Sequence, residues 1–126
     1  MSAFSITSTI KKYPKHDYQD IKEAVLGKRY NLSLVFIGKT RAGTLNQEYR
    51  NKTYNPNVLS FPLTEQSGEI FICPDVAQSE ARDYGLSVNG YSAFLFIHGC
   101  LHLKGLAHGD TMDTQEQKYL KKFNIS

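Results

Sequence analysis

The period of the hydrophobic positions changes along the chain and indicates which element each segment forms. Alternating apolar and polar residues over 3–10 predict a strand with one buried face, which carries Phe4, Ile6 and Ile10. A nearly continuous apolar run over 32–37 predicts a second strand that is buried on both faces.

Two shorter apolar runs, over 58–61 and 69–73, predict a hairpin or a pair of neighbouring strands. Pro62 is expected to end the first run, and Ser67 with Gly68 supplies a turn signal before the second. We therefore expect a sheet of about four strands.

Apolar residues recur at helical spacing in the remaining segments. We expect one helix over 18–26 and a short one that starts at Thr40 and includes Leu45 and Tyr49. A third is expected over 74–84, with Val76, Ala77, Ala81 and Tyr84 on one face. Two more are expected over 91–104, with Ser87 as a possible cap before it, and over 113–123, with Tyr119, Leu120 and Phe123 facing inward. The helix over 91–104 is apolar on nearly every side and should be central and buried. The expected fold is α+β, with a single domain over 1–126, an approximately four-stranded mixed sheet and four to five helices.

Composition limits the class of protein. The chain has 126 residues, of which 40% are hydrophobic and 21% charged, so it can bury a core without disulfides. No segment approaches the roughly 18 apolar residues of a membrane span, and the first residues lack the pattern of a secretion signal, so we expect a cytoplasmic protein without membrane contact. Cys73 and Cys100 are expected to be reduced and buried. The net charge of +3 permits a polyanionic partner but indicates it only weakly.

Three of the four histidines lie within one short segment, "IHGCLHLKGLAHGD". His98 and His102 are four residues apart, so on a helix they share a face and their ring nitrogens can converge on one ion. On a continuing helix His108 would lie about 9 Å further along and rotated away from that face. Gly105 can end the helix in the left-handed conformation and so return His108 to the other two.

Three neutral imidazoles without a fourth protein ligand are typical of an open zinc site, where a water molecule completes the coordination and its pKa falls toward about 7. Cys100 lies about 200° around the helix from His98, so it should point into the core rather than serve as a ligand. His16, in a polar stretch, is expected to be a surface residue.

The same spacing occurs in metzincin zinc peptidases, in which a glutamate beside the first histidine acts as general base. Gly99 stands at that position and cannot accept a proton. Met112 is too close to His108 to be identified as the Met-turn of those enzymes, and it is expected to pack in the core or start a helix. A zinc peptidase is therefore an alternative that lacks its base.

The segment "HGCLHLKGLAH" resembles the signature HGxLHLxGYDH of the YbeY family, the metal-dependent bacterial endoribonucleases of ribosomal RNA maturation. The segments "LNQEYR", "NVLSFP" and "GEIFICPDVA" follow the order and approximate spacing of the other motifs of that family, so the resemblance covers about 32–126. Leu106 and Ala107 replace a Tyr-Asp pair of the signature, and Pro56 and Asn57 replace a Thr-Asp pair.

This resemblance implies that His98, His102 and His108 bind the metal and that Arg50 is functionally important. A guanidinium offers two donors in one plane to the phosphate oxygens on which charge develops during hydrolysis.

Ser60 and Asp110 could each belong to the site, but each also has a simpler structural explanation. Ser60 resembles a family position near the active-site cleft, or is a strand serine with a backbone hydrogen bond. Asp110 could orient one imidazole in place of the missing aspartate, or simply cap the last helix.

The function implied is a zinc-dependent single-strand endoribonuclease in rRNA maturation or ribosome quality control, with RNA and ribosomal particles as partners. Lys104, Lys118, Lys121 and Lys122 could hold the RNA backbone, although a solvated helix face explains the last three equally well. Besides the peptidase, a second alternative is a ribosome-assembly factor whose metal is structural.

Overall fold

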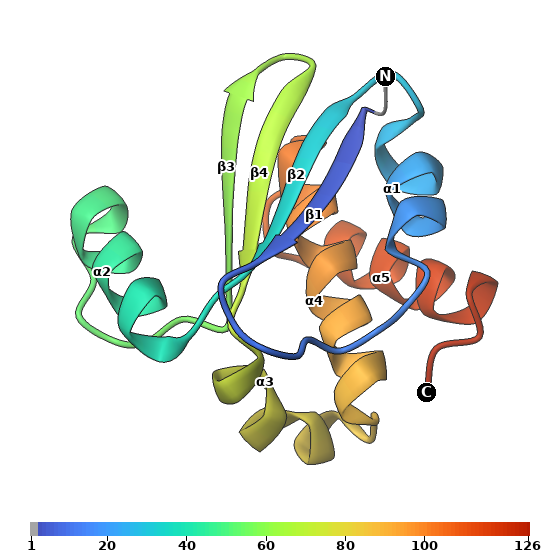
Figure 1. Cartoon of the computed structure of the whole chain (residues 1–126). Coiled ribbons are helices and arrows are strands. Elements are labelled where there is room, and N and C mark those ends of the chain that lie inside the picture. The colour runs from blue at the N-terminus through green and yellow to red at the C-terminus, as the bar shows by residue number, and fades with distance from the viewer. Residues whose placement is uncertain (1–2) are drawn as a thin grey trace.

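The computed structural model describes residues 3–126 and contains a sheet with helices on both faces (Figure 1). The strands are β1 (Phe4–Ser8), β2 (Asn31–Phe36), β3 (Val58–Thr64) and β4 (Ser67–Ile72). The helices are α1 (Tyr18–Leu26), α2 (Lys39–Arg50), α3 (Pro74–Glu80), α4 (Val88–Leu103) and α5 (Asp110–Lys122), with a 3-10 turn, η1 (Ala81–Tyr84), after α3.

The sheet is mixed, with strand order β1-β2-β4-β3. The strand β2 pairs parallel with both β1 and β4, whereas β3 pairs antiparallel with β4 as a hairpin. The predicted α+β class, the mixed four-stranded sheet and the hairpin are confirmed.

The hairpin differs from the sequence prediction at its turn. Pro62 does not end β3 but pairs with Gly68, and the register shifts between Pro62 and Thr64. Because β3 is an edge strand, a proline there removes no bond from the interior of the sheet. Ser67 and Gly68 belong to β4, and the turn lies two residues earlier than predicted, at 65–66.

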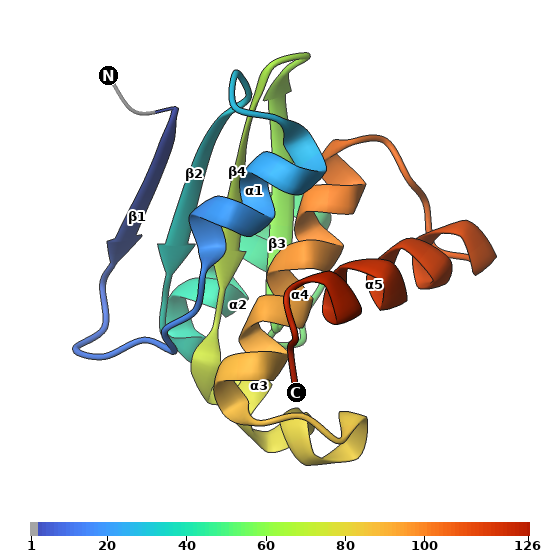
Figure 2. The ribbon, with the colours of Figure 1, turned by 90° about the vertical axis from the view of Figure 1, so that its right-hand side faces the viewer.

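The helices α1, α4 and α5 cover one face of the sheet and α2 lies on the other (Figure 2). On β2, Leu34 and Phe36 are fully buried toward the α4 layer, while Val35 packs into the smaller cluster beneath α2. The strand is thus covered on both faces as predicted, but it is fully buried on one face and only partly buried on the other.

The helix α4 runs through the centre of the molecule and contacts α1, α5, β3 and β4. Its Phe96, Ile97 and Cys100 side chains are completely buried, as predicted for an apolar helix. Ser87 caps its first turn by accepting a hydrogen bond from the Gly90 amide at 3.0 Å. None of the helices formed by residues 3–126 is long and apolar enough to span a membrane.

Three residues of the predicted apolar patterns are partly or largely exposed. On β1, Phe4 is buried, but Ile6 is 36% exposed because β1 is the other edge of the sheet. Tyr49 on α2 is 67% exposed. Tyr84 is 58% exposed because the tighter 3-10 turn replaces the last turn of the predicted helix and changes the direction of its side chains.

The final helix, α5, begins at Asp110, three residues before its predicted start. Met112 is buried in its first turn, which confirms the core-packing interpretation of that residue. Tyr119 is buried on the same face and holds the helix against the core.

Candidate metal centre

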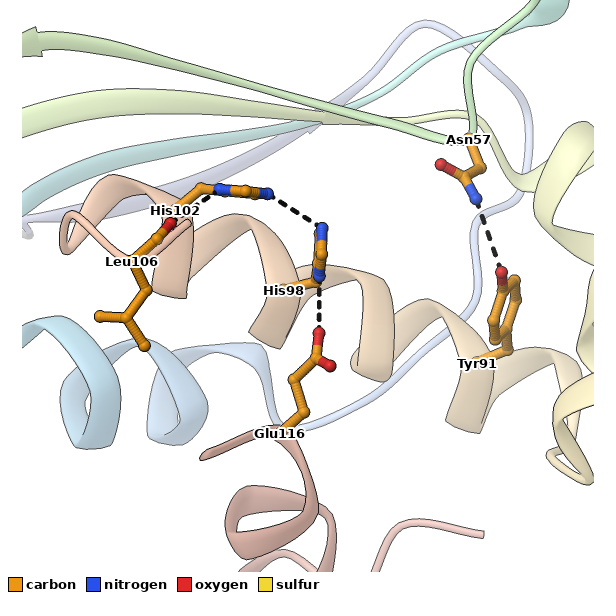
Figure 3. A network of polar contacts seen from close by, with 6 residues as sticks. All are labelled: Asn57, Tyr91, His98, His102, Leu106 and Glu116. Atoms are coloured by element: carbon orange, nitrogen blue, oxygen red, sulfur yellow. Dashed lines mark hydrogen bonds and ion pairs between the residues drawn. The ribbon is translucent and has the colours of Figure 1, made fainter. Parts of the chain in front are cut away.

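The last turns of α4 carry two histidines that face each other. His98 and His102 lie one helical turn apart, and their Nε2 atoms are 3.0 Å from each other. The two rings are nearly perpendicular, at 88° (Figure 3). The prediction that the four-residue spacing would bring these nitrogens together is confirmed.

The chain leaves α4 through a left-handed turn at Gly105, whose φ is 108°. The Gly105 amide donates to the carbonyl of His102 at 2.9 Å, and the Leu106 amide donates to the carbonyl of Leu101 at 3.0 Å, which closes the helix end. The chain then returns His108 to within 4.9 Å and 4.7 Å, between ring centroids, of the two helical histidines. One potential ligand atom from each of the three residues lies within 4.8 Å of the others.

Each helical histidine has a hydrogen-bond acceptor at its other ring nitrogen. His98 Nδ1 lies 2.6 Å from Oε2 of Glu116 on α5, and His102 Nδ1 lies 3.0 Å from the carbonyl oxygen of Leu106 (Figure 3). Because a carboxylate and a carbonyl both accept, each Nδ1 carries the hydrogen and donates it. The partner of His102 is a backbone atom, so a leucine at 106 can supply it without loss.

This hydrogen-bond pattern tests whether a cation fits between the rings. With both Nδ1 atoms protonated, a neutral imidazole presents an unshared electron pair at Nε2. His98 and His102 then point two such pairs at each other across 3.0 Å, an arrangement that a shared positive charge stabilises. The three histidines therefore fit a metal ion that binds imidazole nitrogen.

The surroundings also favour the neutral form that a metal requires. Burial lowers the pKa of His102, and the nearby imidazoles of His98 and His108 lower it further. A lower pKa means that protons compete less with a metal ion for this nitrogen.

The histidines line one wall of an open cavity of about 440 Å³. Arg50, the last residue of α2, and Ser60 on β3 line the same cavity. His108 is exposed, whereas His98 and His102 are half-buried. The structure thus brings Arg50, Ser60 and the three histidines to one place, and leaves the cluster accessible to solvent.

The carboxylate that reaches a histidine was not predicted from the sequence. Asp110 lies exposed in the first turn of α5, and Glu116, six residues further along, holds His98 instead. A signal was present, because Met112, Glu116 and Tyr119 share one helical face and an acidic residue between two buried apolar ones needs a partner.

The two cysteines lie outside the cluster and are buried as predicted, whereas His16, expected at the surface, is half-buried. Cys100 is fully buried away from the histidines' cavity, and burial raises the pKa of its thiol. Cys73 is also buried, and neither cysteine forms a disulfide. His16 lies outside the cluster, where its Nδ1 accepts a hydrogen bond from the Asp17 amide at 2.9 Å.

Gly99 stands beside the first histidine, where a metzincin-type peptidase has its glutamate, and it packs against the sheet. It is buried, and a Cβ atom at this position would lie 3.0 Å from Cδ1 of Ile70 on β4. Ile70 would have to shift by a few tenths of an ångström to admit a side chain there. As the chain stands, position 99 supplies no general base of the metzincin type.

The fold and the histidine cluster together define a class of protein: an α+β domain with three histidines that could hold one metal ion at the edge of an open cavity. A family model described as Endoribonuclease YbeY matches residues 3–124. The chain belongs to this family.

Relatives named Endoribonuclease YbeY cover most of this chain. The protein from Mesoplasma florum is 35% identical over an alignment of 105 residues, and the match covers 75% of this chain and 62% of the relative. The one from Bdellovibrio bacteriovorus is 35% identical over 99 residues, which are 77% of this chain and 63% of the relative. The one from Staphylococcus carnosus is 36% identical over an alignment of 107 residues, and the match covers 75% of this chain and 70% of the relative. The chain thus spans less than two thirds of the length of the first two.

The fold has a solved counterpart. The solution structure of TM1509 from Thermotoga maritima superimposes with a TM-score of 0.68, at 24% sequence identity, over 95% of this chain and 88% of that one. This likeness supports the arrangement of sheet and helices described above.

Proposed function

We propose that this chain is a zinc-dependent endoribonuclease that cleaves single-stranded RNA, with residues 1–126 acting as one metallohydrolase domain. The observation that carries the proposal is the open cavity in which three convergent imidazoles lie together with Arg50. Membership of a family described as Endoribonuclease YbeY supports the same reaction.

His98, His102 and His108 would hold the metal. Zinc is our choice because three imidazoles with an open position are a common catalytic zinc set. When bound, the ion would supply Lewis-acid chemistry to a phosphate and to a water molecule.

The residues of the chain would position the ligands and the substrate. Glu116 fixes the ring of His98 and the Leu106 carbonyl fixes that of His102, so both present Nε2 to the cavity. Arg50 would donate to the nonbridging oxygens of the scissile phosphodiester and stabilise the charge that develops there. Lys104, exposed just beyond α4, would hold the RNA backbone nearby.

The resemblance of "HGCLHLKGLAH" to the family signature supports a more specific role. We propose that the substrate is ribosomal RNA, in precursors or ribosomal particles, and that the protein acts in the cytoplasm, where those particles are assembled.

The test is cleavage of a labelled single-stranded RNA by the metal-loaded protein. We expect cleavage by the parent, loss of cleavage in the His102→Ala variant and full retention in His16→Ala, the matched control at the histidine outside the cluster. An intact RNA after incubation with the metal-loaded parent would contradict the proposal.

The same samples separate the two alternatives. Cleavage of an unstructured peptide that disappears in His102→Ala, with RNA left intact, would indicate a peptidase. A metal-loaded protein that cleaves neither substrate and unfolds when the metal is chelated would indicate a structural metal.

A further inference from the structure

A second cavity of about 650 Å³ lies on the other side of the histidine cluster, between η1, α4 and α5. Asn57, Val58, His98 and His108 line both cavities. The two spaces are therefore neighbours that share a wall at the metal centre, and an extended ligand can occupy both.

One wall of the second cavity is aromatic. Tyr84, Tyr91 and Phe94 line it, and the Tyr84 ring lies 4.9 Å from the Tyr91 ring and 5.6 Å from the Phe94 ring, between centroids. Tyr91 is buried, and its hydroxyl accepts a long hydrogen bond from Asn57 Nδ2 at 3.5 Å (Figure 3). Tyr84 is 58% exposed, so a large exposed ring is supported from behind by rings that are held in place.

The exposure of Tyr84 leaves its ring where a ligand in the second cavity can reach it. A tyrosine that only completed the core would bury its ring, as Tyr91 does. A flat ring that faces a cavity and is fixed by its neighbours is instead the arrangement on which unpaired nucleobases stack.

The charge of the second cavity argues for a base rather than a phosphate. The wall contributed by α5 carries Asp113, Glu116 and Gln117, and none of the described residues that line the cavity is lysine or arginine. Two carboxylates repel a phosphate, whereas Arg50 makes the first cavity suitable for one. An exposed carboxylate and an amide can also hydrogen-bond the amino and carbonyl groups on the edge of a base.

We propose that the second cavity binds one unpaired base of single-stranded RNA, stacked on Tyr84, while the adjoining phosphodiester lies in the histidine cavity. This inference rests on the proposed function, since it places the base next to the bond that would be cut. It makes Tyr84 a residue that binds the substrate, and it explains a preference for unpaired strands, because a base within a duplex cannot enter the cavity.

The test measures the affinity of the metal-loaded protein for a fluorescein-labelled single-stranded RNA of about ten nucleotides, within the usual site size of single-strand binders. The integrity of the probe is checked on a denaturing gel. We expect Tyr84→Ala to weaken binding about tenfold, the loss of one stacked base, and Tyr84→Phe to retain affinity within about twofold. Tyr49→Ala, which removes a tyrosine that is at least as exposed and lines neither cavity, should also bind like the parent.

A second probe of the same length, with abasic sites in place of nucleotides, distinguishes stacking from other causes. Tyr84→Ala and the parent should bind it equally, because the backbone contacts remain. The inference is overturned if Tyr84→Ala binds the ordinary RNA as tightly as the parent, or if it loses the same affinity for the abasic probe. Failure of the parent to bind RNA also overturns it.

The cleavage assay separates this inference from the proposed function. RNA binding that depends on Tyr84 without any cleavage would leave the base site standing and remove the endonuclease. If the protein cleaves RNA but binds it equally well without the Tyr84 ring, the endonuclease proposal stands and the base site is removed.

Discussion

The contact between Glu116 and His98 connects two helices at the histidine cluster. The carboxylate lies in the core-facing side of α5, 6% exposed, and the 2.6 Å bond fixes the orientation and tautomer of the ring. Glu116 would in this way set how well the proposed metal is held without touching it.

We expect Glu116→Gln to weaken metal affinity by about ten- to a hundredfold, the usual effect of removing the partner of a metal-binding histidine. An amide can still accept the hydrogen bond, but it lacks the negative charge that strengthens the ring as a ligand. Competition with a coloured chelator measures the affinity. The matched control is Glu48→Gln, an exposed glutamate on α2, and equal affinities in both variants would contradict this role of Glu116.

Arg50 is the second side chain whose replacement should change the activity. Arg50→Ala should retain metal content and fold but lower the rate of RNA cleavage by about a hundredfold, the effect of removing one donor to developing charge. Arg41→Ala, which removes an exposed arginine of the same helix that does not line the cavity, is the control. Unchanged cleavage in Arg50→Ala would remove Arg50 from the mechanism.

At the scale of elements, the site depends on how α4 ends. The two helical histidines come from the helix itself, but the third requires the chain to reverse within six residues, and Gly105 does this with a φ that other residues rarely adopt. A Cβ atom at this position would meet no other atom within 4 Å, so the need for glycine is a matter of backbone conformation alone.

Gly105→Ala should therefore lower the free energy of unfolding by about 1–2 kcal/mol and also weaken metal binding, because His108 moves. Gly27→Ala is a matched control: its φ is 91°, its Cβ would also meet nothing within 4 Å, and it ends α1 rather than α4. Urea unfolding of the metal-free proteins and metal titration measure the two effects. The account is wrong at this point if the two variants lose metal affinity equally.

Local sequence patterns predict some parts of the site and the sheet but not others. The pair His98 and His102, and the glycine break before His108, follow from local spacing, so this part of the site was predicted. Glu116 comes from another helix, and its contact depends on how α5 packs against α4, which no local pattern contains. The local sequence predicts that Pro62 ends its strand, but a proline is tolerated in an edge strand, and strand order is a property of the whole sheet.

At the scale of the whole molecule, the buried core makes stability depend on pH. Cys100 is fully buried, and burial raises the pKa of its thiol, so the folded protein keeps this proton at high pH. In the unfolded chain the thiol has its ordinary pKa of about 8.5. Above that pH the unfolded chain binds fewer protons than the folded one, and the free energy of unfolding falls as the pH rises.

The Cys100→Ala variant isolates this effect from that of Lys22, whose pKa burial lowers and which acts in the opposite sense. We expect the stability difference between the parent and Cys100→Ala to be constant below about pH 8 and to shift by about 1.4 kcal/mol per pH unit, against the parent, above about pH 9. Urea unfolding followed by circular dichroism measures it. A difference that stays constant up to pH values near 10 would mean that the thiol is not held in its neutral form.

The central claim is that one bend in the backbone gathers three imidazoles around a single cation, and calorimetric titration of the metal-stripped protein with Zn²⁺ tests it most directly. The account predicts one site per chain in the parent and in His16→Ala, and a large loss of affinity in each of His98→Ala, His102→Ala and His108→Ala. Unchanged zinc binding in any of these three variants, or no binding by the parent, would contradict it.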